Sequence, residues 1–536
     1  MPRRSRMASL PDGEAARRRA AALPIDFLGM SGRDSGMLPC VAAARRGALL
    51  EIQAAQAQPQ EGRIGLTKEK FRNKIMLITY ADSLGANLKE LKVVLDRYFK
   101  GTVDGVHILP FFPSSADRGF APLRYDQVDE AFGDFDDIRA LAADHPLMFD
   151  FMVNHISRSS AYFQDFLRRK EDSPYKDLFI RYRDFWPGGA PTNEQVEKIY
   201  KRKPRAPFIT AEFADGSAED IWCTFGPEQI DLDVSKPLTR RFIRDTIEGM
   251  CERGAAIIRL DAFAYAVKKP DTSCFFLEPE IWRLLEEIRQ AAEPYSVAIL
   301  PEIHEHYAIQ LKLARRGYWV YDFALPMLVL HALYTGRGER LKHWLDICPR
   351  RQFTTLDTHD GIGVVDVAGL LSESEIEQTK EHLFAEGANV KRSYNTAAYN
   401  NLDIYQINCT YYSALGDDDA AYLLARAIQF FAPGIPQVYY VGALAGANDI
   451  ERLEATRQGR DINRHAYTLD EIARETRRPV VQKLQALMHL RNTHPAFRGE
   501  CLVSLEGEHG LVITRTDGQH RLTLHADLKT HAFSIG

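Results

Sequence analysis

Short apolar runs alternate with longer amphipathic segments from Lys74 onward. Most of these runs are continuously apolar, as expected for parallel strands that are covered on both faces. Between several of them lie segments such as 88–99 and 280–292, where apolar residues recur with helical spacing. The eight predicted strands, in chain order, are KIMLITYAD, VDGVHILPFFP, PLMFDFMVNH, AAIIRLDAFAY, VAILPEIH, YWVYDFALP, FTTLDTHDG and IPQVYYVGA.

Eight strands with intervening helices predict an α/β fold, a (β/α)8 TIM barrel, with a doubly wound open sheet as the alternative. Two connections are too long for plain loops: 156–240 after strand three, and 361–410 after strand seven. After about Thr493, short alternating strands predict a small β domain. The predicted domains are a catalytic barrel (70–155 and 241–492), an inserted subdomain (156–240) and a C-terminal β domain (493–536).

The first seventy residues lack this pattern. They are rich in Arg and Ala at the start and low in complexity further on, without the continuous apolar segment of a secretory signal. Asp12, Glu14 and Asp26 argue against an Arg-rich organelle transit peptide. We therefore interpret residues 1–69 as a disordered N-terminal extension or an over-called translation start.

Composition and charge narrow the class of protein. Hydrophobic residues at 45% and charged residues at 26% are ordinary for a globular chain, and the net charge of -5 favours neither a nucleic-acid nor a membrane partner. The longest apolar stretch, 422–445, contains Arg426, prolines and glycines, so no membrane span is predicted. Seven scattered cysteines without a C-x-x-C pair indicate free thiols in a reducing cytoplasm and no zinc site.

Ionisable side chains collect at the carboxyl ends of the predicted strands. One acidic residue there often only caps a helix, but Asp261, Glu302 and Asp360 follow three different strands, each near an Arg or a His. Arg259 shares a strand face with Asp261, so we expect it to lower the pKa of that carboxyl and favour a nucleophile. Glu302 follows an apolar run, where desolvation is expected to raise its pKa and suit a general acid. Retaining glycosyl transfer needs such a pair, with Asp360 binding sugar hydroxyls.

These strand ends look like the four signature segments of the α-amylase superfamily. From about Lys70 onward the chain also resembles the sucrose phosphorylases, in phrases such as LITYADSLG, RLDAFAY, LDTHDGIGV, NLDIYQIN and GRDINRH. The resemblance implies Asp261 as nucleophile, Glu302 as acid/base and Asp360 as transition-state stabiliser. The signature segments are Asp150–His155, Arg259–Asp261, Glu302 and His359–Asp360.

The resemblance also implies a substrate site around these carboxylates. Asp117 and Arg460 would close the floor of the glucose pocket, with Phe120 and Phe225 as an aromatic gate. The plainer interpretation makes the two phenylalanines and Tyr265 core aromatics, the histidines structural groups, and Arg460 a surface ion-pair partner. The other implied binding residues are His155, Arg259 and His359 against glucose, Tyr265 and Gln229 on the acceptor side, and the loop residues Asp403, Ile404, Tyr405 and Gln406.

The phosphate site departs from the family pattern. Sucrose phosphorylases carry Tyr-Arg-Pro-Arg-Pro in the insertion, where the second Arg meets phosphate, whereas Lys203 stands at that place in this chain. Lysine binds phosphate as a point charge without the bidentate fork, and a solvated basic loop is the alternative. The extra cations of segment 200–205 resemble the sucrose 6F-phosphate phosphorylases, whereas Tyr405 and Gln406 match the sucrose-specific members.

The resemblance therefore implies a retaining glycosyltransferase that converts sucrose and phosphate to α-glucose 1-phosphate and fructose, without metal or organic cofactor. Sucrose 6F-phosphate, glucosylglycerol and glucosylglycerate are alternative donors, and a hydrolase or transglucosidase is an alternative activity. A catalytically inactive barrel that only binds partners is disfavoured because all three carboxylates are present. The resemblance implies a homodimer.

Overall fold

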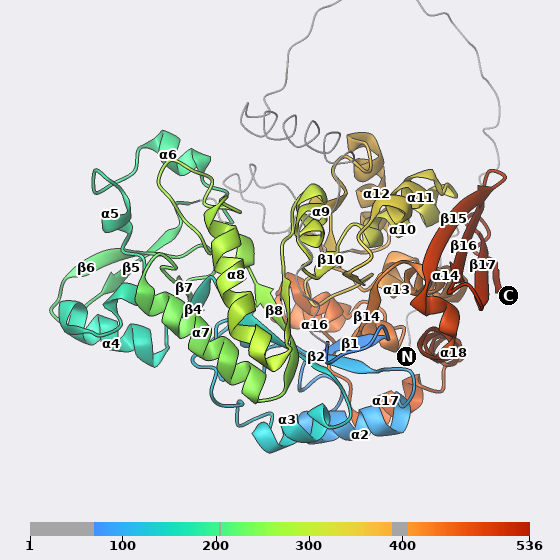
Figure 1. Ribbon diagram of the computed structural model, residues 1–536, viewed down its shortest axis with the longest axis horizontal. Helices are drawn as coiled ribbons and strands as arrows, with labels where there is room; N and C mark the ends of the chain where they lie inside the picture. Colours follow the sequence, from blue (N-terminus) through green and yellow to red (C-terminus); the bar gives the residue numbers. More distant parts are fainter. Residues whose placement is uncertain (1–68, 203–204, 389–405) are drawn as a thin grey trace, which may run out of the picture. The chain divides into compact units, whose positions relative to one another are not determined.

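The structure is a computed structural model that describes residues 69–202, 205–388 and 406–536 (Figure 1). Its central sheet has eight strands in the order β10-β11-β14-β1-β2-β3-β8-β9, and neighbouring strands pair in parallel. Strands β9 and β10 also contact each other, so the sheet closes and the barrel prediction is confirmed. The strands are β1 (Met76–Thr79), β2 (Gly105–Ile108), β3 (Leu147–Met152), β8 (Ala255–Asp261), β9 (Ala298–Pro301), β10 (Val320–Asp322), β11 (Gln352–Thr354) and β14 (Ile435–Tyr439).

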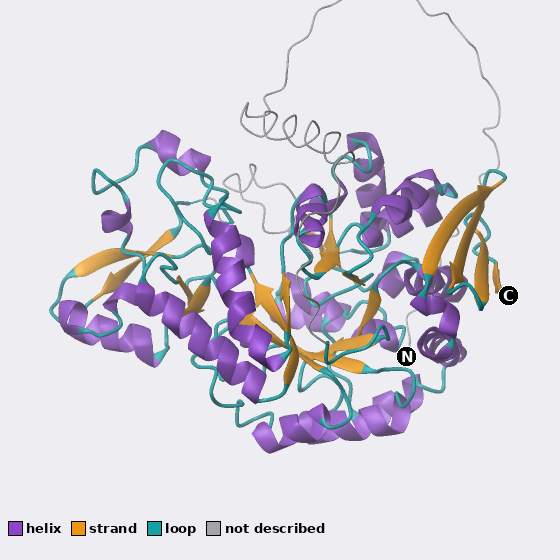
Figure 2. Cartoon of the chain, viewed as in Figure 1, coloured by secondary structure: helices purple, strands orange, loops and turns teal. Residues whose placement is uncertain are grey.

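Helices cover the strands, as the continuous apolar runs predicted (Figure 2). Helix α2 (Leu88–Tyr98) is typical: the Asn87 side chain accepts from the backbone N–H of Glu90, and Leu88, Leu91, Val94 and Leu95 are buried on one face. The other helices of this part are α3 (Phe135–Ala142), α7 (Pro237–Glu252), α8 (Glu280–Ala292), α9 (Ala308–Arg315), α10 (Leu325–Thr335), α11 (Glu339–Ile347), α12 (Glu373–Ala385), α13 (Tyr411–Ala414), α14 (Asp419–Phe431), α15 (Tyr440–Ala443), α16 (Ile450–Thr456), α17 (Leu469–Glu475) and α18 (Pro479–Thr493).

The long connection after β3 forms a structured insertion. It starts and ends with β4 (His155–Ser157) and β7 (Gln229–Asp231), which pair antiparallel. Phe163, Phe166, Phe179 and Ile221 belong to a hydrophobic cluster separate from the main core, so the insertion has apolar packing of its own. Between β4 and β7 lie α4 (Ala161–Arg169), α5 (Tyr182–Phe185), α6 (Asn193–Lys198) and the hairpin of β5 (Phe208–Glu212) and β6 (Ala218–Trp222).

The chain ends in an antiparallel sheet, which confirms the predicted C-terminal β structure. Its strands are β15 (Glu500–Glu506), β16 (Gly510–Thr516), β17 (Arg521–Asp527) and β18 (Phe533–Ile535), and it packs on α11 and α14. The residue limits of the predicted domains stay a prediction, and the N-terminal extension lies outside the described residues except for Glu69. In the described part of the chain, no helix combines the length and apolar character needed to cross a membrane.

A buried ammonium group joins the insertion to the barrel. Lys268 Nζ lies 2.8 Å from Asp231 Oδ2 on β7, 2.8 Å from Asn154 Oδ1 and 2.8 Å from the Tyr265 carbonyl oxygen. Both charged side chains are almost fully buried. Three oxygens therefore solvate the ammonium, and it in turn neutralises Asp231.

Replacing Lys268 with Met is expected to destabilise the fold by about 3–5 kcal/mol, because Asp231 would be left as an uncompensated buried charge. Urea-induced unfolding measures this effect. Lys269→Met is the matched control: its ammonium pairs with Glu280 at the surface, where screening makes the pair weak. Equal stability of the two variants would contradict the assignment of Lys268 as a structural cation.

Candidate active site

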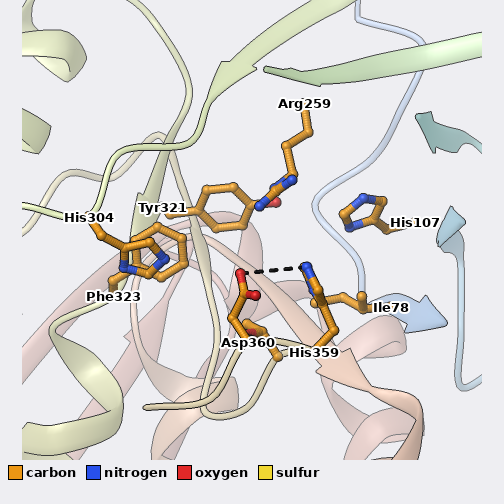
Figure 3. A pocket seen from close by; sticks show the side chains of 9 residues that line it. Ile78, His107, Arg259, His304, Tyr321, Phe323, His359 and Asp360 are labelled. Carbon is orange, nitrogen blue, oxygen red and sulfur yellow. Dashed lines mark hydrogen bonds and ion pairs between the residues drawn. The ribbon is translucent and has the colours of Figure 1, made fainter. Parts of the chain in front are cut away.

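The carboxyl ends of the barrel strands bring the predicted ionisable groups to one pocket (Figure 3). Arg259 and Asp261 come from the end of β8, Glu302 directly follows β9, and Asp360 lies in the segment after β11. In Figure 3 the side chains of Arg259, His304, His359 and Asp360 extend toward one shared space. The pocket is lined by Ile78, His107, Arg259, His304, Tyr321, Phe323, Thr358, His359 and Asp360.

Arg259 is the electrostatic centre of this pocket. Its Nη1 donates to Asp150 Oδ1 at 2.5 Å and to Asp261 Oδ1 at 3.0 Å, and its Nη2 lies 3.8 Å from Glu302 Oε1. Asp150 also faces His107 Nε2 at 2.7 Å. Burial raises the pKa of Asp150, but His107 and Arg259 outweigh it and lower that pKa to about 2. One buried guanidinium thus holds three carboxyl groups together.

The pKa directions predicted for Asp261 and Glu302 are wrong. Burial raises the pKa of Asp261 well above its usual value, because it outweighs Arg259 and because neighbouring carboxylates add to it. Burial also raises the pKa of Glu302, but the hydrogen bond from His304 and the charge of Arg259 outweigh it and lower that pKa to about 2. The Ala262 N–H donates to Glu302 Oε2 at 3.1 Å and further favours the ionised form.

Asp360 belongs to the floor of the pocket. Arg460 Nη2 lies 3.1 Å from Asp360 Oδ1, and its Nη1 lies 3.6 Å from Asp117 Oδ2, as expected for the predicted floor pair. His359 Nε2 lies 3.5 Å from Asp360 Oδ2. Burial raises the pKa of Asp360, but the neighbouring positive charges, Arg460 first among them, together outweigh it and hold that pKa below its usual range. Burial lowers the pKa of His359 to about 3, so this ring is neutral at pH 7.

The predicted aromatic and amide residues adjoin the same floor. Phe120 stacks on His359 with ring centroids 4.9 Å apart, and its carbonyl oxygen accepts from Gln229 Nε2 at 3.0 Å and faces His155 Nε2 at 2.9 Å. Phe225 contacts the His155 ring, with centroids 5.6 Å apart. Phe120 is therefore buried and Phe225 half-buried, and both pack against the site's own side chains.

The acceptor side is described only in part. Phe225 and Tyr265 are in edge contact at 5.1 Å, and Arg202 lies over the Tyr265 ring at 5.2 Å. Gln406 Nε2 lies 3.1 Å from His304 Nε2, which places Gln406 at the edge of the same pocket. Four predicted site residues lie outside the described residues: Lys203, Asp403, Ile404 and Tyr405.

Sequence reasoning missed several side chains at this site, among them His107, Tyr321, Phe323 and Asp366. His107 is buried on β2, and Tyr321 and Phe323 extend from the end of β10 into the pocket. Asp366, in the 3-10 helix η6 (Val365–Val367), lies 3.3 Å from His304 Nδ1. The histidine within the apolar run of β2 was an available signal, since a buried His needs a polar partner. Asp366 carried no such signal, because only the folding of its loop brings it to His304.

One ligand atom from each of Glu302, His304 and Asp360 lies within 4.8 Å of the others, a spacing that a metal ion could use. Within the described residues, however, both nitrogens of His304 already face carboxylate oxygens. A histidine that bears a proton on each nitrogen has no lone pair for a metal. The geometry of this cluster therefore favours hydrogen bonding between its members over metal coordination.

Comparisons with known proteins agree with this geometry. The family model described as "Alpha amylase, catalytic domain" matches residues 78–316. Sucrose phosphorylase of Streptococcus mutans serotype c is 58% identical over 467 residues, which cover 86% of this chain and 97% of that protein. Sucrose 6(F)-phosphate phosphorylase of Thermoanaerobacterium thermosaccharolyticum is 45% identical over 87% of this chain and 97% of that protein.

A solved structure gives the same result. The crystal structure of sucrose 6F-phosphate phosphorylase from Thermoanaerobacter thermosaccharolyticum superposes with a TM-score of 0.84 at 44% identity, covering 88% of this chain and 97% of that one. The shared sequence thus spans nearly the whole length of these relatives and includes the barrel, the insertion and the C-terminal sheet. The chain therefore belongs to the sucrose phosphorylase family of the α-amylase superfamily.

Proposed function

We propose that this enzyme is a retaining sucrose phosphorylase, which converts sucrose and inorganic phosphate to α-glucose 1-phosphate and fructose. The observation that carries the proposal is the placement of Arg259 between Asp261 and Glu302, opposite Asp360, in a chain 58% identical to a sucrose phosphorylase. Two carboxyl groups beside one sugar position can perform a double displacement.

In this proposal Asp261 attacks the anomeric carbon while Glu302 protonates the departing fructose oxygen. Phosphate then attacks the glucosyl-enzyme from the side that fructose has left, so the α-configuration is retained. Asp360, held ionised by Arg460, binds sugar hydroxyls and stabilises the positive charge that develops on the ring. His304 and Arg259 hold Glu302 ionised, and Asp261 must be ionised to attack, so the proton that Glu302 delivers has to come from another neighbour.

The proposed glucose pocket is the polar floor between Arg460 and the Phe120–His359 stack. In this proposal the ion pairs of Arg460 with Asp117 and Asp360 close the floor, and the pocket holds one glucosyl unit. The acceptor side would be formed by Phe225, Tyr265 and Gln229, together with Lys203 and the loop residues Asp403, Ile404, Tyr405 and Gln406. Phosphate and fructose would occupy this side in alternate half-reactions.

Among possible donors we favour sucrose, because identity is higher to the sucrose phosphorylase (58%) than to the sucrose 6(F)-phosphate phosphorylase (45%). Tyr405 and Gln406 support the same choice. Glucose 1-phosphate release should be measured with sucrose, sucrose 6F-phosphate, glucosylglycerol and glucosylglycerate, each with and without phosphate. We expect sucrose to give the highest kcat/KM. A preference of about a hundredfold, or 2.7 kcal/mol, for the phosphorylated donor would overturn the choice of substrate.

The location and the assembly of the enzyme are further parts of the proposal. A cytoplasmic location is supported by the six described cysteines, which are free thiols and of which five are buried. The homodimer implied by the family resemblance is a further proposal. Size-exclusion chromatography with light scattering would give the mass of the assembly.

A further inference from the structure

A chain of three ionisable groups leads away from the acid/base residue. Glu302 Oε1 lies 3.2 Å from His304 Nε2, and His304 Nδ1 lies 3.3 Å from Asp366 Oδ2. All three side chains are buried or nearly so. The His304 ring stacks on Phe323 with centroids 3.9 Å apart, an arrangement that is visible in Figure 3 and that fixes the plane of the imidazole.

This arrangement specifies the protonation state of His304. An ionised carboxylate only accepts hydrogen bonds, and an imidazole can donate from both nitrogens only as the cation. Since each nitrogen faces a carboxylate oxygen, the geometry fits an imidazolium between two carboxylates. Gln406 fits this state as well, because a half-turn of its amide presents Oε1, an acceptor, to His304 Nε2.

Close packing holds Asp366 in place. Gly363 on β12 (Ile362–Gly363) lies beside the Asp366 carboxylate, and a Cβ at this position would clash with Asp366 Oδ2 and lie 3.6 Å from His304 Nδ1. Only glycine therefore permits this approach of β12 to the carboxylate. Within the described residues, Asp366 Oδ1 has no hydrogen-bond partner. The carboxylate therefore interacts mainly with His304, through Oδ2.

We propose that His304, held by Asp366, stores the proton that Glu302 delivers to the leaving group. When donor binds, the proton on His304 Nε2 moves to Glu302 Oε1 and from there to the glycosidic oxygen as its bond to the anomeric carbon breaks. In the second half-reaction the proton of the attacking phosphate returns through Glu302 to His304. Asp366 is a positioning residue in this account, which deepens the proposed function and rests on it.

The other charges around His304 fit this role. Asp360 offers an oxygen within 4.8 Å of the cluster and favours the cation, whereas Arg259, beside Glu302, opposes it. Burial lowers the pKa of His304, but Asp366 and Glu302 outweigh it and raise that pKa to about 10. The stored proton is therefore present at neutral pH, and it is lost as the pH rises through the pKa of the pair.

The test compares two donors across pH. The alkaline limb of kcat/KM reports loss of the essential proton from the free enzyme. In Asp366→Asn the carboxylate that raises the pKa of His304 is absent, so with sucrose this limb should move to lower pH by about 1–2 units. With α-D-glucosyl fluoride as donor, the alkaline limb of Asp366→Asn should coincide with that of the wild type. Fluoride departs without full protonation, so the proton of His304 is not needed with this donor. Near pH 5.5 both donors should react at close to wild-type rates.

Two further variants separate this role from a structural one. Gly363→Ala keeps every ionisable group but displaces Asp366, so it should shift the sucrose limb in the same direction. Asp322→Asn removes another buried carboxyl of the barrel, which accepts from Trp344, Gln352 and Leu325 rather than from His304. It should lower the melting temperature without moving the alkaline limb.

Several outcomes would overturn the proposal. An equal loss on both donors at every pH would make Asp366 a merely structural residue, and an unchanged sucrose limb would place the proton source elsewhere, for example on Asp261. If Asp366→Asn does not fold, ¹⁵N-histidine NMR of the wild type at pH 8 decides: a neutral His304 contradicts the proposal. If the wild type turns over the fluoride but not sucrose, the proposed donor fails instead, and the profile is measured with the donor that the panel identifies.

Discussion

Replacing Asp261 with Asn should lower turnover of sucrose by about 10⁴-fold or more, the scale seen when a covalent nucleophile is removed. The amide cannot form a glucosyl ester with the anomeric carbon. Arg259 keeps its hydrogen bond to Asp150 and its proximity to Glu302, so the pocket should stay assembled. Initial rates of glucose 1-phosphate release measure the loss.

The experiment also needs a test of folding. The melting temperature of Asp261→Asn should stay within a few degrees of the wild type, and Asp322→Asn serves as the buried-carboxyl control that retains turnover. α-D-Glucosyl fluoride should not rescue Asp261→Asn, because an easier leaving group does not replace a missing nucleophile. A correctly folded Asp261→Asn variant with wild-type activity would refute the assignment.

Replacing Glu302 with Gln should lower kcat/KM for sucrose by about 10²–10⁴-fold, the usual contribution of a general acid. The alkoxide of fructose is a poor leaving group without a proton, whereas fluoride is a good one. Glucosyl-enzyme formation from α-D-glucosyl fluoride should therefore be nearly unaffected. Single-turnover measurements with both donors separate this step from the later attack of phosphate.

The contrast between the two donors is what identifies the role of Glu302. Equal losses on sucrose and on the fluoride would show that Glu302 shapes the pocket rather than protonating the leaving group. In Glu302→Gln the alkaline limb of the kcat/KM profile with sucrose should also disappear. The proton held by His304 then has no carboxylate beside the substrate to accept it. A persistent limb at the wild-type pH would contradict the acid/base assignment.

The barrel could be predicted because its sequence pattern is local. Each continuous apolar run became a parallel strand, and the amphipathic pattern of 280–292 became α8 with the same limits. The insertion and the C-terminal sheet also follow from loop length and alternating polarity. The exact domain limits depend on packing between segments that are distant in sequence, and the pattern does not encode them.

The site could be predicted as a set of residues but not in its electrostatics. Motif spacing placed Asp261, Glu302 and Asp360 correctly at one end of the barrel. The pKa direction of Asp261 failed because burial outweighs Arg259, and that of Glu302 failed because His304 and Arg259 together outweigh burial. His304 reaches Glu302 from two residues away, and Asp366 reaches His304 across 62 positions of the chain. The contact of His304 with Glu302 spans the same two positions as that of Arg259 with Asp261 and could have been weighed, whereas the contact of Asp366 with His304 could not be predicted from spacing.

The anomeric configuration of the first-formed product tests the central claim most directly. Enzyme, sucrose and inorganic phosphate should be followed by ¹H and ³¹P NMR from the earliest measurable time. The account predicts α-glucose 1-phosphate and fructose in equal amounts, because two displacements through Asp261 retain the configuration of the donor. β-Glucose 1-phosphate would require a single displacement, and free glucose as the main product would show that water rather than phosphate is the acceptor. Either result would contradict the account.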